Sequence, residues 1–133
     1  TGKLLGLPFP AGKAVDALSC ESPCKERYRV KLNGLDFSFS GIQNKTEKFF
    51  SETKNAADTA KFVMNCIVNC IADATRAALA QYPGLPVVFS CGVASNSMLR
   101  ERMREFAPVF AEPLFSTDNA MGIAVLAALQ EDA

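Results

Sequence analysis

Apolar residues recur at three- and four-residue steps along the middle of the chain, from Asn55 to Gln81. This spacing predicts one long helix with a broad apolar face, ended by Tyr82-Pro83-Gly84. A shorter run, Ala11–Leu18, predicts a second helix whose apolar positions also share one face. The apolar face of the long helix is expected to hold Ala56, Ala60, Val63, Ile67, Cys70, Ile71 and Ala74.

The rest of the first third predicts short elements. Polar and apolar residues alternate over Arg27–Leu32, which predicts a strand with one solvated face. Asn33-Gly34 is a strong hairpin-turn signal, so Leu35–Phe39 is expected to return as a second strand. The remaining segments are predicted as a helix end (Thr1–Gly6), a loop (Ser19–Lys25) and a weakly helical stretch (residues 40–54).

The last third alternates between strand and helix signals. Pro86–Ser90 is a β-branched and aromatic run typical of a buried strand, and a helix is expected over Ser97–Glu105. A second short buried strand is predicted at Val109–Ala111. Ser116–Asn119 is then expected to cap a final helix, Ala120–Gln130. This order indicates an α/β protein with parallel strands and with both turns at the carboxyl ends of strands.

Composition narrows the classes of function. The chain has 133 residues and is 49% hydrophobic, which is enough for one core and predicts a single domain over residues 1–133. Fourteen basic residues balance fourteen acidic ones without a basic stripe, so RNA contact is expected to need a partner or sequence outside this chain. With no signal peptide and no apolar run of eighteen residues, we expect no membrane and a cytoplasmic location.

The chain has five cysteines and no histidine. The odd count, and the placing of Cys66 and Cys70 in a helical stretch, argue against a disulfide framework. Cys20 and Cys24 lack a second pair with matching spacing, so a structural zinc site is not favoured. Without histidine, these residues cannot form a Ser–His–Asp or Cys–His centre or a zinc-protease helix.

Small residues after the Pro86–Ser90 strand form the first candidate site. Gly92 would let a ligand approach exposed backbone N–H groups, and the Asn96 amide could donate and accept hydrogen bonds to that ligand. The alternative is that Ser95, Asn96 or Ser97 simply caps the following helix.

Two further candidates carry a carboxylate near a helix start. Asp118 could ligate a metal ion or hold a metal–phosphate complex, with a plain helix cap as the alternative. Gly12 would open a helix tightly, and Asp16 one turn later could accept hydrogen bonds from ribose hydroxyls. Asp16 could equally be a solvated residue favoured near a helix N-terminus.

Taken together, these segments resemble the TsaD/Gcp family, also known as Kae/YgjD-type or peptidase M22 "glycoproteases". The resemblance lies in LLGLPFPAG, GLDFSFSG, VVFSCGVASNSMLRERM and FSTDNAMGIA, in the family's order and approximate spacing. It implies the C-terminal lobe of an actin-like ATPase fold (sugar kinase/Hsp70/actin, ribonuclease H-like). Because the chain begins abruptly, we expect a fragment of a longer two-lobe protein that is inactive by itself.

The resemblance also implies a function. Family members transfer a threonylcarbamoyl group to N6 of adenosine 37 in tRNA, and were historically called O-sialoglycoprotein endopeptidases. Gly12, Asp16, Gly92 and Asn96 would contact ATP or an adenylate, and Asp118 would complete an iron or zinc site with two histidines from the other lobe. The implied partners are that lobe, TsaB/TsaE-like proteins and tRNA bound through the complex, with a homodimer of the fragment as a further expectation.

Departures from the family pattern leave two alternatives open. Cys91 stands where the family usually has a glycine, and its side chain narrows the backbone approach to a ligand. Gln43 replaces the usual basic residue after FSFSG. The sequence of the motifs LPFPAG and STDNAMGIA is similar to that of a divergent Firmicutes-type paralogue. The alternatives are a non-catalytic, actin-like scaffold for protein interactions and the metalloprotease of the older family name.

Overall fold

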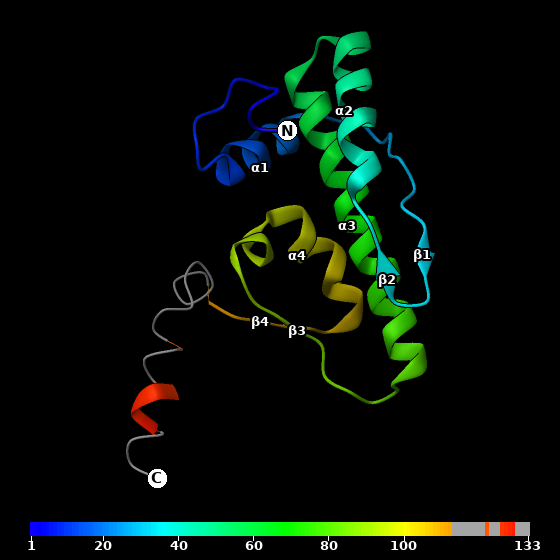
Figure 1. Cartoon of the computed structure of the whole chain (residues 1–133), viewed down its shortest axis with the longest axis vertical. Helices are drawn as coiled ribbons and strands as arrows, with labels where there is room; N and C mark the ends of the chain where they lie inside the picture. The colour runs from blue at the N-terminus through cyan, green and yellow to red at the C-terminus, as the bar shows by residue number, and fades with distance from the viewer. Residues whose placement is uncertain (113–121, 123–125, 130–133) are drawn as a thin grey trace.

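The computed structural model describes residues 1–112, 122 and 126–129. One long helix, α3, runs through it (Figure 1), with α1 and α4 on one side and the β1–β2 hairpin on the other. The helices are α1 (Gly12–Glu21), α2 (Ser40–Thr53), α3 (Ala56–Gln81), η1 (Gly92–Ser95), α4 (Ser97–Met103) and η2 (Arg104–Phe106). The strands are β1 (Leu32–Asn33), β2 (Asp36–Phe37), β3 (Val88–Phe89) and β4 (Val109–Phe110).

Helix α3 confirms the strongest periodicity in the sequence. Asn55 caps it by accepting a hydrogen bond from the Asp58 backbone N–H at 3.1 Å. The predicted apolar face is buried at Ala60, Val63 and Cys70, but it is only part of the buried surface, because α3 is packed on two sides. Phe62, Val63, Cys66 and Cys70 pack with Val30, Ile42 and Phe49, whereas Met64, Val68 and Ala72 pack with Leu99 and Met103.

The two packed sides of α3 explain its composition. By length and mean hydropathy, α3 is also apolar enough to cross a membrane. Its apolar residues, however, contact protein: the Phe49 and Phe62 rings stack with centroids 4.5 Å apart, and Leu99 and Met103 of α4 are buried against the other side. The contacts therefore fit a core helix, which passes the same test of length and composition.

The front of the chain confirms one sequence prediction and corrects two. Residues 1–6 form a single helical turn, with Leu5 N–H bonded to the Thr1 carbonyl at 3.0 Å, and it ends at Gly6 (φ +68°) as predicted. Helix α1, by contrast, continues to Glu21 and so takes up the first three residues of the predicted loop. Residues 27–31 are not a strand, because groups in and just before this segment form hydrogen bonds with side chains of α3 instead of with a second strand. The Tyr28 N–H lies 3.1 Å from the Cys66 Sγ, and the Asn65 amide donates to the Cys24 carbonyl at 3.1 Å.

The predicted hairpin exists but is shorter and shifted by one residue. Leu32 pairs with Phe37 and Asn33 with Asp36, so the two turn residues are Gly34 and Leu35. Gly34 has φ +62°, a left-handed conformation that glycine adopts without steric cost. The glycine thus occupies the first turn position rather than the second.

The back of the described chain confirms the α/β class and parallel pairing. Val88 pairs with Val109, and Phe89 pairs with Phe110. The two phenylalanine rings stack with their centroids 5.3 Å apart, and they pack against the core cluster that contains Leu99 and Met103. The prediction of fully buried strands is wrong, because Val88 and Val109 are 64% and 61% exposed. Helix Ser97–Glu105 is confirmed as α4 and η2. The predicted cap at Ser116–Asn119 lies outside the described residues, and of the final helix residues 122 and 126–129 are described as helical.

Candidate functional site

Asp16 and Asn96 meet in space although eighty residues separate them. Asp16 lies on the half-buried side of α1, and its carboxylate accepts a hydrogen bond from Asn96 Nδ2 at 2.8 Å. It accepts two more from Ser97, at 3.1 Å from the backbone N–H and at 2.8 Å from Oγ. The three groups join α1 to the start of α4, and we call them the Asp16 cluster.

The local sequence explains the geometry at Asn96. Asn96 is extended (φ −63°, ψ 133°), and its side-chain oxygen accepts from the Leu99 backbone N–H at 2.9 Å. It therefore caps α4, as the alternative interpretation predicted, while its amide nitrogen remains free to donate to Asp16. The Asp16 carboxylate in turn satisfies the Ser97 N–H, which has no partner within the helix. Asp16 is thus a bridge between helices and not the solvated residue of the alternative.

The two predicted glycines flank this cluster. Gly12 lies one helical turn before Asp16, and Gly92 begins η1, which leads into Asn96. Both are exposed, neither has a positive φ, and a Cβ added to either would meet no atom within 4 Å. Neither backbone conformation nor packing in the described residues therefore requires glycine at these positions.

Cys91 begins the loop in a conformation that is normally reserved for glycine. Its φ of 86° and ψ of 167° bring the Cβ of an L-residue into steric conflict with the backbone. The Ser95 hydroxyl, at the other end of the same loop, is buried and has no hydrogen-bond partner among the described residues. The segment from Cys91 to Asn96 is thus held in a specific and strained form.

Arg100 ties this loop to the end of β4. Its Nε donates to the Ala94 carbonyl at 2.9 Å, and its Nη2 donates to the Ala111 carbonyl at 3.2 Å. The guanidinium also lies 4.6 Å from the centroid of the Phe110 ring. The sequence pattern did not single out Arg100, nor the hydrogen bonds from Ser97 to Asp16. The signal that could have found it is its place one helical turn after the Asn96 cap.

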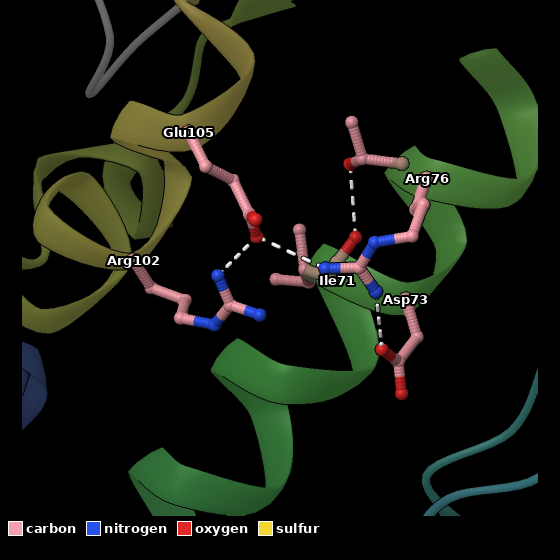
Figure 2. A network of polar contacts seen from close by, with 6 residues as sticks. Ile71, Asp73, Arg76, Arg102 and Glu105 are labelled. Atoms are coloured by element: carbon pink, nitrogen blue, oxygen red, sulfur yellow. Dashed lines mark hydrogen bonds and ion pairs between the residues drawn. The ribbon is translucent and has the colours of Figure 1, made fainter.

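A network of ion pairs fastens α4 and η2 to α3 (Figure 2). Arg76 Nη1 lies 3.0 Å from Asp73 Oδ1, and Arg76 Nη2 lies 3.0 Å from Glu105 Oε1. Glu105 also accepts from Arg102. All four side chains are at least one-third exposed, so the network fixes orientation more than it adds stability.

The described residues do not form a metal site. Within them, no group of three His, Cys, Asp or Glu side chains lies close enough to hold an ion. Asp118, the predicted ligand, lies outside the described residues, and its role stays a prediction. The five cysteines are free thiols, and burial raises the pKa of both Cys66 and Cys70. Neither buried thiol has the low pKa of a nucleophile or metal ligand.

Comparison with known proteins identifies the family. The sequence model of the TsaD family, described as tRNA N6-adenosine threonylcarbamoyltransferase, matches residues 1–125. The chain therefore belongs to this family. Proteins with that name from Streptococcus suis and Pelodictyon phaeoclathratiforme are 32% and 34% identical to it over 142 and 159 residues. These alignments cover 98% of this chain but 42% and 44% of the relatives. The chain thus spans less than half the length of these curated relatives.

Proposed function

We propose that this chain serves, within a longer two-lobe protein, as part of a tRNA N6-adenosine threonylcarbamoyltransferase. The observation that carries the proposal is the Asp16 cluster, which brings two of the four expected adenylate contacts within 2.8 Å of each other. The family name of the relatives supplies the reaction class. In this proposal the chain is the C-terminal lobe of an actin-like fold, and the fragment by itself does not turn over.

The adenylate would approach the loop between Gly92 and Asn96 and the start of α1. Open space at Gly12 and Gly92 fits a ligand that comes close to the backbone. One lone pair of the Asp16 carboxylate stays available after its three hydrogen bonds, which allows a ribose hydroxyl to donate to it.

The metal is a separate part of the proposal. Asp118 would supply one carboxylate to a divalent ion, iron or zinc, and the other ligands would come from outside this chain, which has no histidine. Among the described residues, no three His, Cys, Asp or Glu side chains lie close enough together to hold this ion.

The proposed partners follow from the family. They are the other lobe, TsaB/TsaE-like proteins and tRNA, in the cytoplasm and away from membranes. The exposed Val88 and Val109 on the β3–β4 pair are apolar surface that another lobe, or a second copy of this chain, would cover.

The adenylate contacts can be tested by replacing the two glycines. Gly12→Ala and Gly92→Ala add a Cβ into open space, so the fold should keep its unfolding midpoint. Because no nucleotide is expected to bind this chain alone, we expect each variant to weaken AMP or ATP binding to the intact two-lobe protein, measured by isothermal titration calorimetry. The matched control is Gly41→Ala on α2, where the added Cβ makes an ordinary contact 3.9 Å from the Tyr28 ring. Unchanged adenylate affinity in both site variants would refute the assignment.

A non-catalytic scaffold is the second candidate, and Cys91 favours it. Cys91 is exposed, and its side chain narrows the path by which a ligand would approach the backbone of this loop. Cys91→Gly should raise adenylate affinity if the loop is a narrowed binding site. A wild-type chain and a Cys91→Gly variant that both fail to bind adenylate would favour the scaffold.

A further inference from the structure

An open cavity of about 350 Å³ lies between α3 and the segment that follows α1. Three cationic side chains line it, Lys25 and Arg27 from the segment and Lys61 from α3, together with the amides of Asn65 and Asn69. We call these five residues the basic groove. The groove is not apparent from the sequence. Glu26 separates Lys25 from Arg27, and Lys61 lies thirty-four positions after Arg27.

The fold builds the groove from two rigid sides. Lys61, Asn65 and Asn69 follow one another at four-residue steps, so they share one half-buried face of α3. The Asn65 amide donates to the carbonyls of Cys24 and Glu26, at 3.1 Å each, and so fastens the opposite side to the helix. The backbone of residues 24–26 is therefore fixed, while Lys25 and Arg27 remain exposed.

Lys25, Arg27 and Lys61 make no ion pair within the described part of the chain, whereas Lys48 and Arg104 pair with nearby glutamates. Two carboxylates stand near these cations in the sequence: Glu26 lies between Lys25 and Arg27, and Asp58, which accepts from Ser22 Oγ at 2.5 Å, lies three positions before Lys61. They reduce the positive charge of the groove but do not outnumber its cations. Three cations around one hollow therefore still favour an anion.

The positive surface extends beyond the groove. Arg27 and Asn69 also line an adjoining cavity of about 220 Å³, together with Arg29, Tyr28 and one carboxylate, Asp73, which pairs with Arg76. Tyr28 is 38% exposed, and Lys45 of α2 lies 5.5 Å from the centroid of its ring. Cations at alternate positions with an exposed aromatic ring nearby suit a sugar–phosphate backbone better than a single small anion.

We propose that the basic groove binds the phosphate backbone of RNA, and that this chain therefore contacts its tRNA directly. The choice of RNA rests on the proposed function. The groove is formed by Lys61, Asn65 and Asn69 on α3 and by the segment after α1, not by Gly12, Gly92 or the Asp16 cluster, so the two proposals can fail separately.

The test compares two charge-matched triple variants of the 133-residue chain. One combines Lys25→Gln, Arg27→Gln and Lys61→Gln. The control, which removes the same charge elsewhere, combines Lys3→Gln, Lys48→Gln and Arg104→Gln. Affinity for a fluorescently labelled tRNA transcript is measured by anisotropy between about 50 and 200 mM salt, the range over which phosphate contacts lose strength steeply. Circular dichroism verifies the fold of both variants.

We expect the groove variant to lose on the order of tenfold in tRNA affinity at the low-salt end. The slope of log affinity against log salt should fall by about one for each cation removed. The control should stay within about twofold of the wild type, because its two lysines and one arginine do not line the groove. Equal losses in the two variants would show a general charge effect and overturn the proposal.

Two further measurements separate the proposals. If polyglutamate displaces the tRNA as well as unlabelled tRNA does, the groove is a site for acidic protein and the RNA assignment fails. AMP affinity is measured on the intact two-lobe protein that carries the same three groove substitutions, and we expect it to be unchanged. Groove-dependent tRNA binding combined with an intact protein that does not bind AMP would refute the adenylate site but leave the groove standing.

Discussion

Replacing Cys91 by glycine should stabilise the protein. Cys91 has φ 86° and ψ 167°, a region that is essentially restricted to glycine and costs another residue about 1–3 kcal/mol. Its side chain is exposed, so its removal loses little buried surface. A glycine is also more flexible in the unfolded chain, which offsets about 0.4–1 kcal/mol of the gain.

The expected net gain is therefore about 0.5–2 kcal/mol in the free energy of unfolding. For a chain of 133 residues, this corresponds to an increase of about 2–8 °C in Tm. Urea unfolding followed by circular dichroism measures the free energy, and a thermal scan gives Tm. The slope of the urea transition should not change, since the variant exposes the same surface on unfolding.

Cys91→Ala is the matched control. Alanine removes the thiol but keeps the Cβ that conflicts with the backbone, so its stability should stay within about 0.5 kcal/mol of the wild type. The reasoning would be refuted if the glycine and alanine variants had the same stability, or if glycine were the less stable of the two. Either result would mean that the loop relaxes around the cysteine without strain.

Four other predictions concern individual side-chain contacts. Asp16→Ala should lower the free energy of unfolding by about 1–3 kcal/mol, because it removes three hydrogen bonds to a carboxylate that join α1 to α4; no loss in urea would contradict the bridging role. Phe62→Ala should cost about 3–5 kcal/mol in the same assay, since Phe62 is 7% exposed and stacked in the core. Glu105→Gln should cost no more than about 1 kcal/mol, and the difference should vanish in about 1 M salt if the pairs are screened. Because burial raises the pKa of Cys66, the folded state keeps a proton that the unfolded state loses, so stability should fall as pH rises past the ordinary thiol range of about 8.5; Cys66→Val should flatten that fall.

The sequence predicted those elements whose cause is local. The three- and four-residue spacing between Asn55 and Gln81 defines α3 because one periodic pattern covers more than seven turns. The Asn96 cap and the two strands that hold Phe89 and Phe110 also follow from short stretches with clear signals. Family motifs then added Gly12 and Asp16, which spacing alone did not distinguish from ordinary helix residues.

What the sequence did not predict depends on distant partners. Alternation over residues 27–31 predicted a strand, but the groups that hold this part of the chain, Asn65 and Cys66, lie on α3. Two faces of α3 are buried because elements from both ends of the chain pack on it, and a periodicity count reveals only the stronger face. The three hydrogen bonds of Asp16 likewise depend on a helix that begins eighty residues later.

The two separate cores on α3 have a consequence for cooperativity. The first is completed by α2 and the segment before the hairpin, and the second by α4, so each can open while the other still covers one side of the helix. Local unfolding of either half would leave α3 as an ordinary amphipathic helix. Amide protons in the middle of α3 should thus exchange with solvent more slowly than those of α2 or α4, because their release requires both halves to open.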